Sequence, residues 1–258
     1  MARRLSQLID QWRLRKVQDR WAKAADDAAG MAPSSLRSLR AEARAMRRQI
    51  DRLIHEADHR LSLPVLGAAL PRAPLGSDWV WRGDAWRGAL PQPGAAATES
   101  RTPISDDLAL YHDCPLAEVL VRQSRNRDDS HRAPFGLGIE VFGFRGSFLS
   151  LAINLPDEAV QGLKARHLIR VDAIVEADRP VRAFARLNVK HGPNIAQMVS
   201  ELPVTGAAGS LAEFDLAYAR LDDTRIERAW LDLIFNDAAM NQIQLRDVVV
   251  SRRPRAEL

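Results

Sequence analysis

The feature that most constrains this chain is a strict alternation of apolar and polar residues in short runs over its second half. From Leu149 onward, every second residue in 148–155 is Leu or Ile. The same period of two recurs in residues 167–176, 181–191 and 228–235. Side chains alternate in this way when a strand turns one face to a core and the other to solvent. The pattern therefore predicts an antiparallel β-sandwich.

Strand-like runs of this kind continue through residues 106–258 and are separated by Gly, Pro and Asn. A short helical turn is expected at 156–164, where Pro156 opens an acidic stretch. Strands at this spacing are typical of a jelly-roll-like sandwich. The expected strands are 108–112, 117–123, 137–144, 147–155, 167–176, 181–191, 211–218, 226–235 and 243–252.

Residues 1–61 have a different period and predict two helices, at 3–29 and 35–61. Gly30 can end the first helix and Pro33 can begin the second. The short break favours an antiparallel, coiled-coil-like hairpin, so the fold class is α+β. One apolar seam rarely stabilises an isolated hairpin, so we expect it to pack on a second copy, on the sandwich or on a partner. That seam consists of Leu36, Leu39, Ala43, Met46, Ile50, Leu53 and Ala57.

Between these two regions, residues 62–105 are rich in Pro, Gly and Ala, which rules out long regular structure. Three of the six tryptophans of the chain lie in residues 77–88. A disordered linker would not usually carry them, because burying an aromatic ring is worth several kcal/mol. We expect this linker to lie across the sandwich and cover an apolar edge. A platform for a sugar or a protein partner is the alternative.

The basic excess of the chain is local. Residues 1–60 hold 14 Lys and Arg against 8 Asp and Glu, a net charge of +6, whereas the whole chain carries +4. Residues 61–258 therefore carry −2, and an anionic partner is expected to meet the helices. Helix 3–29 mixes acidic with basic residues, so anionic membrane contact is the weaker alternative, and no motif indicates nucleic-acid binding.

Targeting and redox signals are sparse. The N-terminal residues lack the apolar segment of a secretory signal, and no stretch approaches the length of a membrane-spanning helix. Cys114 is the single cysteine, which excludes an intramolecular disulfide and a cysteine-based zinc cluster. A cytoplasmic location is the expectation, with peripheral attachment to a membrane left open.

The polar face of the predicted sandwich is the best candidate for a binding site. If the strands at 167–176, 181–191 and 228–235 are neighbours, their outward residues place planar donors and acceptors around one aromatic ring. Carbohydrate sites combine a ring for stacking with groups that hydrogen-bond hydroxyls. An ordinary solvated sheet face also displays polar residues, so the alternative that this face only meets solvent stays open. The candidate ligand-binding residues are Trp230, Asp232, Arg186, Asn188, Asp172, Arg170, His191 and Asn194.

No catalytic constellation is evident in the sequence. His55 and His59 match the H-E-x-x-H spacing of zinc proteases. If Ile50, Leu53 and Ala57 mark the buried seam, however, both histidines point to solvent. We therefore expect neither an enzyme nor a cofactor nor a metal, and a hydrolase that uses the sandwich face or a zinc ion at these histidines is kept as an alternative.

Two resemblances add to this interpretation. Residues 229–235 and 243–253 resemble the closing strands of galactose-binding-like and carbohydrate-binding-module jelly rolls, which implies a sugar-binding sandwich. The whole chain resembles an uncharacterised proteobacterial family known only as a domain of unknown function. The stretches 134–137, 166–170 and 190–194 carry that second resemblance, and it implies no activity.

The sequence therefore predicts a non-catalytic binding or assembly protein. Its sandwich would present a face for a glycan or a protein, and its helical hairpin would serve for homo-oligomerisation or docking. A peripheral membrane or envelope-associated scaffold is the second class of function that remains open.

Overall fold

The computed structural model describes residues 2–62, 74–127 and 133–255, and in the N-terminal helices it describes the side chains of 12–57. These residues form two compact units, Met1–Arg52 and Leu53–Leu258.

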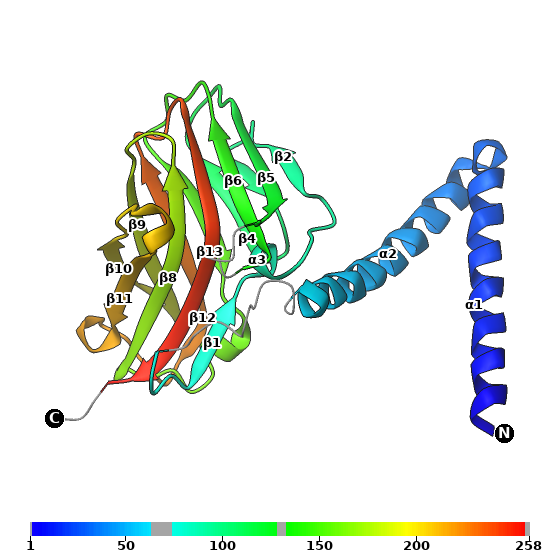
Figure 1. Cartoon of the computed structure of the whole chain (residues 1–258), viewed down its shortest axis with the longest axis horizontal. Helices are drawn as coiled ribbons and strands as arrows, with labels where there is room; N and C mark the ends of the chain where they lie inside the picture. Colours follow the sequence, from blue (N-terminus) through cyan, green and yellow to red (C-terminus); the bar gives the residue numbers. More distant parts are fainter. Residues whose placement is uncertain (1, 63–73, 128–132, 256–258) are drawn as a thin grey trace. The chain divides into compact units, whose positions relative to one another are not determined.

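The first unit contains helix α1 (Ala2–Asp27), the 3₁₀ turn η1 (Ala28–Gly30) and most of helix α2 (Pro33–Ser62). The two helices and the turn between them confirm the predicted elements. In Figure 1, α1 and α2 meet at η1 and diverge from it. Arg20 of α1 and Glu42 of α2 still form an ion pair, with 3.3 Å between nitrogen and oxygen. Because the helices diverge beyond this contact, the hairpin is open and is not closely packed along its length.

The divergence of the helices exposes the apolar seam. Leu36 and Leu39, near the turn, are half-buried, whereas Met46 and Ile50 further along α2 are exposed. None of the described helices combines the length and the apolar composition that a membrane span requires.

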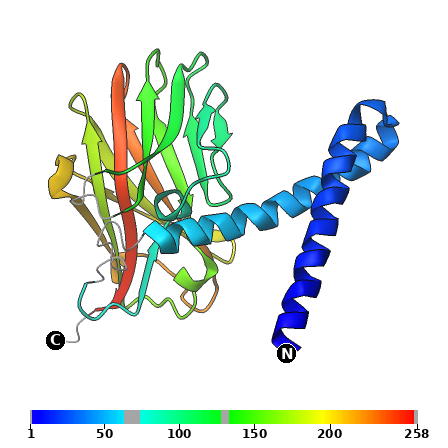
Figure 2. The same ribbon diagram turned by 45° about the vertical axis from the view of Figure 1, so that its right-hand side comes forward.

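The second unit contains two antiparallel sheets that lie face to face (Figures 1 and 2). In the first, the β13 sheet, the strand order is β11-β8-β13-β6-β5-β2, and β1 also pairs with β13. In the second, the β12 sheet, the order is β10-β9-β12-β7-β4-β3. The strands of the β13 sheet are β1 (Trp79–Arg82), β2 (Gly94–Ala96), β5 (Val119–Arg125), β6 (Phe135–Val141), β8 (His167–Ala177), β11 (Ser210–Asp215) and β13 (Asn241–Pro254). Those of the β12 sheet are β3 (Arg101–Pro103), β4 (Leu108–His112), β7 (Leu149–Asn154), β9 (Arg182–His191), β10 (Asn194–Glu201) and β12 (Ile226–Asn236).

The chain passes from one sheet to the other at every connection between β4 and β13 except the β5–β6 and β9–β10 hairpins. This alternation between sheets gives the jelly-roll-like sandwich that the sequence predicts. Short 3₁₀ turns fill three of the connections: η3 (Asp157–Ala159), η4 (Gly206–Ala208) and η5 (Leu216–Tyr218).

The core lies between the two sheets and takes every second side chain of the long strands. In β12, Leu231, Leu233 and Phe235 are buried on the inner face, whereas Trp230 and Ile234 on the outer face are only half-buried. Asp232, also on the outer face, is buried among its polar partners. Each neighbouring strand contributes its inward residues in register with these. The period-two pattern of the sequence is therefore the pattern of burial in the structure.

All nine expected strands are present, although the ends of several shift by one or more residues. The strand expected at 211–218 ends three residues early, at Asp215, and the turn η5 follows. The Asp215 side chain accepts a hydrogen bond from the backbone N–H of Ala217 and ends the strand. The sequence did not indicate β10, because as an edge strand it buries few of its side chains.

The Trp-rich segment of 62–105 belongs to the sandwich. β1 pairs with β13, and the one-turn helix α3 (Asp84–Arg87) inserts Trp86 into the core, where its side chain is 0 % exposed. The indole N–H donates to the backbone oxygen of Leu245 at 2.8 Å. A Cβ atom on Gly83 would lie 2.9 Å from the Trp86 ring, so only glycine allows this close approach.

The side chain of Gln123 on β5 holds the chain that follows β1 in place. Its Nε2 donates to the backbone oxygens of Ala85 and Gly88, each at 2.8 Å, and its Oε1 accepts from the N–H of Leu90, also at 2.8 Å. Gln123 is itself buried, so one side chain satisfies three backbone groups that water could not reach.

We expect Trp86→Ala to lower the free energy of unfolding by about 3–5 kcal/mol, because it leaves a large cavity and an unsatisfied backbone oxygen. Urea denaturation followed by circular dichroism measures the change. Tyr218→Ala is the matched control, since Tyr218 is 80 % exposed and its removal should change stability by less than about 0.5 kcal/mol. Equal stabilities of the two variants would contradict this account of α3.

Candidate functional site: a groove on the outer face of the β12 sheet

The outer face of the β12 sheet brings together four of the eight candidate residues. In the register of β12 against β9, Trp230 lies opposite Asn188 and Asp232 lies opposite Arg186. Because side chains directly opposite each other on antiparallel strands are neighbours, these four form one cluster.

Asp232 is the centre of this cluster. Its Oδ2 atom accepts hydrogen bonds from Nε of Arg186 at 2.9 Å and from Nδ2 of Asn188 at 2.8 Å, and Nη2 of Arg186 lies 2.8 Å from the same oxygen. Nε2 of Gln197, on β10, donates to Oδ1 of Asn188 at 2.9 Å. The Arg186 guanidinium is therefore held in one orientation by a chain of contacts that crosses three strands.

Burial separates the roles of these residues. Asn188 is fully buried, so it holds Asp232 in place and cannot touch a ligand. Trp230 and the side chain of Arg186 are partly exposed and can do so. Gln197 was missed at the sequence level, because its strand β10 was not expected.

A groove of about 680 Å³ runs over this face. Its floor contains small side chains from the middle of the sheet: Ala109 on β4 and Ser150 and Ala152 on β7. Larger residues stand on both sides, with Trp230 on β12 and Tyr111 on β4. The groove exists because small residues in the centre of the sheet are flanked by large ones.

Two further arginines lie over the aromatic rings of the groove. The Arg228 guanidinium is 5.2 Å from the centre of the Trp230 ring. On the opposite side, Arg101 of β3 is 5.9 Å from the centre of the Tyr111 ring, and its Nε donates to the Tyr111 hydroxyl at 2.9 Å. Both contacts are cation–π interactions, which fix the position of exposed arginine side chains.

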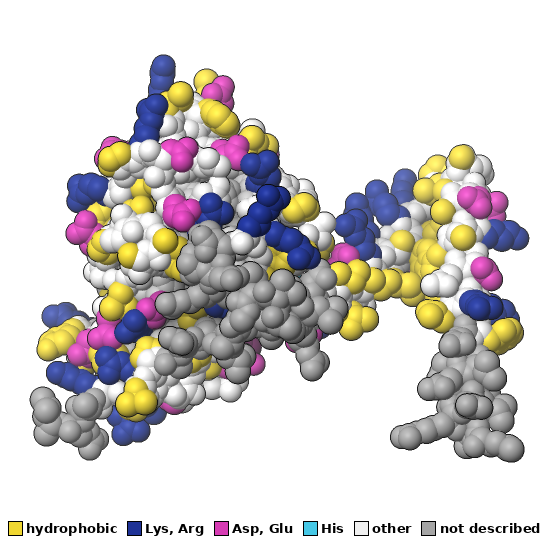
Figure 3. Space-filling view, in the orientation of Figure 1, with side chains coloured by type: hydrophobic (Ala, Val, Ile, Leu, Met, Phe, Trp, Pro, Cys, Tyr) yellow, Lys and Arg dark blue, Asp and Glu magenta, His cyan; other side chains and the backbone are white. Residues whose placement is uncertain are grey.

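Arg170 and Asp172 are not part of this site, because β8 belongs to the other sheet. The two side chains pair with each other through two hydrogen bonds of 2.8 and 2.6 Å, and Asp172 raises the pKa of Arg170. They line a separate groove of about 500 Å³. On the face of the sandwich seen in Figure 3, side chains of both charges are interspersed, as on an ordinary solvated surface.

His191 and Asn194 also lie away from the main groove. They flank the β9–β10 turn, where Gly192 has a positive φ of 54°. Nδ1 of His191 accepts the backbone N–H of Asp222 at 3.2 Å, so this histidine ties two loops together. Both residues line a shallower groove of about 450 Å³ beside Tyr218.

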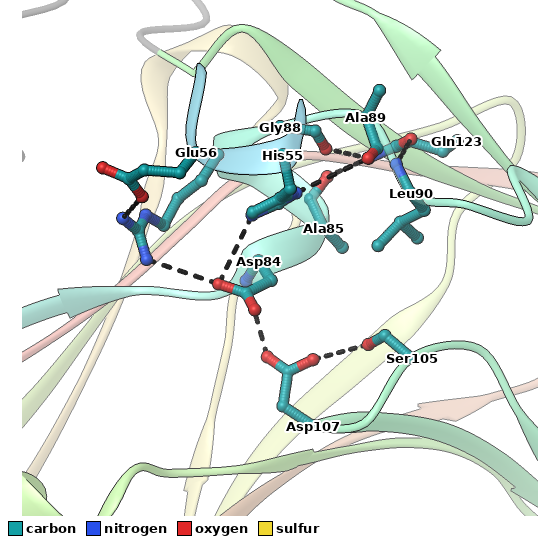
Figure 4. Close-up of polar contacts among 11 residues, drawn as sticks. His55, Glu56, Asp84, Ala85, Gly88, Ala89, Leu90, Ser105, Asp107 and Gln123 are labelled. Atoms are coloured by element: carbon teal, nitrogen blue, oxygen red, sulfur yellow. Dashed lines mark hydrogen bonds and ion pairs between the residues drawn. The ribbon is translucent and has the colours of Figure 1, made fainter. Parts of the chain in front are cut away.

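His55 is not in solvent, so that part of the sequence interpretation is wrong. Its side chain is only 13 % exposed, and its Nε2 forms an ion pair with Oδ1 of Asp84 at 3.6 Å (Figure 4). Its Nδ1 lies 3.5 Å from the backbone oxygen of Ala89. A Cβ atom on Gly88 would lie 2.6 Å from the His55 backbone oxygen, so the helix end packs directly on the chain after α3.

The candidate zinc pair gains no support from this arrangement. His55 is engaged by Asp84 and Ala89, and the side chain of His59 lies outside the described residues. Among the residues whose side chains are described, no group of three or more His, Cys, Asp or Glu could hold a metal ion.

The carboxyl group of Asp107 lies next to this ion pair (Figure 4). Burial raises the pKa of Asp107, whereas His55 lowers the pKa of Asp84. Asp107 accepts hydrogen bonds from the Ser105 hydroxyl at 2.5 Å and from the backbone N–H of Asp84 at 3.4 Å. Opposite shifts in neighbouring carboxyl groups can indicate acid and base partners. Here both carboxyl groups are used to join α2, α3 and the loop before β4.

Comparison with known families identifies the group to which the chain belongs. The model of the family of unknown function DUF6478 matches residues 1–258. The chain belongs to this family. A comparison with curated proteins gave no match.

Solved structures similar to this member of the DUF6478 family include several carbohydrate-binding modules. The family 11 module from Clostridium thermocellum, in complex with a mixed-linked tetrasaccharide, has a TM-score of 0.38 and 10 % identity, over 62 % of this chain and 97 % of the module. The CBM22-1 xylan-binding domain from Paenibacillus barcinonensis has a TM-score of 0.39 and 8 % identity, over 71 % of this chain and 100 % of the domain. The enzymatically active domain of tailspike protein 4 of bacteriophage CBA120 has a TM-score of 0.39 and 7 % identity, over 56 % of this chain and only 19 % of the tailspike chain. Similarity at this level carries no functional argument.

We expect the His55–Asp84 contact to make stability depend on pH. Asp84 raises the pKa of His55, so the stabilisation is fully present below the ordinary histidine pKa of about 6.5 and is lost as the pH rises through the raised value. His55→Gln should therefore cost about 0.5–1 kcal/mol at about pH 5.5 and less at about pH 8.

Urea denaturation at the two pH values measures this difference. Arg87, Glu56 and Asp107 are the other charged residues around the pair, and Arg87 contacts both Glu56, at 3.2 Å, and Asp84, at 3.4 Å. Glu56→Gln is therefore a suitable control, because it removes a charge from the same helix end without touching His55. A His55→Gln effect of equal size at both pH values would contradict the prediction.

Proposed function

We propose that the protein is a non-catalytic glycan-binding protein whose ligand lies in the groove of the β12 sheet. The observation that carries the proposal is the placing of the Trp230 and Tyr111 rings on opposite sides of a floor of small residues, with Arg186 of the adjacent strand β9 held in place by Asp232. A volume of about 680 Å³ lies within the range of ligand-binding pockets.

The chemistry of this groove suits a sugar. Apolar C–H faces of a sugar ring stack on aromatic side chains, and its adjacent hydroxyl groups accept and donate hydrogen bonds in pairs. A guanidinium presents several donors in a fixed plane, and the Asp232 contacts hold that of Arg186 in place before a ligand arrives. The preorganised side chain loses little entropy on binding.

The same geometry supports binding rather than hydrolysis. Glycoside hydrolases use two carboxyl groups, one as an acid and one as a base or nucleophile. In the described part of the groove the carboxyl groups are those of Asp106 and Asp232. Asp232 is engaged by Arg186 and Asn188, which leaves no pair of free carboxyl groups facing the floor.

We expect Trp230→Ala to weaken glycan binding by about tenfold or more, since a central aromatic residue is a typical binding hot spot. Glycan-array screening identifies a ligand, and isothermal titration calorimetry compares its affinity for the two proteins. Tyr218→Ala is the control, because Tyr218 is an exposed aromatic residue outside this groove. Equal affinity of wild type and Trp230→Ala would contradict the site, and a protein ligand would contradict its assignment to a glycan.

We infer a separate role for the helical unit, as an assembly arm that pairs with a second copy. Five large apolar side chains in the described part of this unit are exposed: Trp12, Leu14, Val17, Met46 and Ile50. Apolar residues repeated along two helices are covered when helices associate.

Size-exclusion chromatography with light scattering tests the arm. We expect the wild type to be a dimer or larger and the Met46→Lys, Ile50→Lys double variant to be a monomer, because a charge in an apolar seam opposes association. Gln49→Lys adds a charge at an exposed position beside the seam and should leave the assembly intact. A monomeric wild type would contradict the inference.

A further inference from the structure

We propose that the groove of the β12 sheet selects an acidic glycan, one that carries carboxylate groups such as those of uronic acids. This rests on the proposed glycan-binding function and adds the chemical class of the ligand.

The first step is the charge balance of the groove. Three arginines line it, Arg101, Arg186 and Arg228, against two acidic residues. Asp232 neutralises Arg186 at 2.8 Å. Neither Arg101 nor Arg228 forms an ion pair with a described residue, so the lining has two arginines available for an anion.

The neighbouring carboxylates supply only part of the compensating charge: Arg228 helps to lower the pKa of Glu227, and Asp106 lines the same groove. Glu227, next to Arg228 in the chain, forms its ion pair with Lys190 of β9 instead. Arg101 donates to a neutral group, the Tyr111 hydroxyl. The positive charge is also local, because residues 61–258 together carry a net charge of −2. A basic groove on a slightly acidic sandwich would attract anions to the groove itself and not to the whole surface of the domain.

The second step is the orientation of these arginines. Each guanidinium is placed over an aromatic ring, Arg228 over Trp230 and Arg101 over Tyr111. A guanidinium held in this way still presents its edge to solvent, and its donors match the two oxygens of a carboxylate.

The third step is the distance between Arg101 and Arg228. Arg101 lies in register with Tyr111, and the same row of side chains continues through Ser150 to Ile234 on β12. Arg228 lies six residues from Ile234 along that strand, which is about 20 Å at the rise of a β-strand. A single small anion cannot reach both ends, whereas an extended oligosaccharide with more than one acidic sugar can.

The experiment compares acidic polysaccharides with the same polymers after their carboxyl groups have been reduced to alcohols. Polygalacturonate, alginate and hyaluronan form the panel, and calorimetry or affinity electrophoresis measures binding by the full-length chain. We expect the wild type to bind at least one acidic polymer about tenfold or more tightly than its reduced form, and this preference should shrink as salt is added.

Substitutions then test the two arginines. The Arg101→Gln, Arg228→Gln double variant should lose the preference and bind the acidic polymer no more tightly than the reduced one. Both residues are exposed, so the change should not affect folding, and the thermal unfolding midpoint checks this. Arg122→Gln, on the β13 sheet, removes one surface charge elsewhere and should leave the preference intact.

The outcomes separate this inference from the function on which it rests. Equal binding of acidic and reduced polymers would overturn the inference and leave glycan binding in place. Failure to bind any polymer of either kind would overturn both. Competition by single-stranded DNA that depends on the same two arginines would overturn the assignment to a glycan.

Discussion

The packing of every second side chain between the two sheets is the constraint on which the rest of the structure depends. Leu231 and Leu233 of β12 enter the core, and Asp232 between them must then lie on the outer face. A shift of the register by one residue would move Asp232 inward and expose its neighbours, so the core fixes the position of the site. The buried face and the candidate binding face are two consequences of one alternation.

Side-chain size turns this outer face into a groove. Small residues on β4 and β7 lie between the larger residues of β12 and those at the β3 edge. The position of Arg186 depends on Asp232, which in turn depends on Asn188 and on Gln197 at the opposite edge. The polar part of the groove is therefore held by contacts between strands, and a ligand would meet it already organised.

The segment before the first long strand completes the sandwich. Trp86 adds a large side chain to the core, and Gln123 satisfies the backbone around it. The end of α2 packs on the same segment through His55 and Asp84. Residues 53–57 therefore belong to the sandwich unit, although they continue the helix that begins in the first unit.

The sequence by itself determined the elements and their faces. Both helices, the nine expected strands and the inward positions of β12 follow from local periodicity, because each depends only on residues close together in the chain. The neighbouring positions of Trp230, Asp232, Arg186 and Asn188 also agree with the expectation that their two strands are adjacent.

Only the tertiary structure decided which strands share a sheet. Arg170 and Asp172 have the same local pattern as the groove residues, yet β8 lies in the opposite sheet. Local alternation says that a strand has a polar face but not which strands lie beside it, because pairing depends on contacts between residues far apart in the chain. For the same reason the burial of His55, the insertion of Trp86 and the support from Gln197 emerged only when distant segments were brought together.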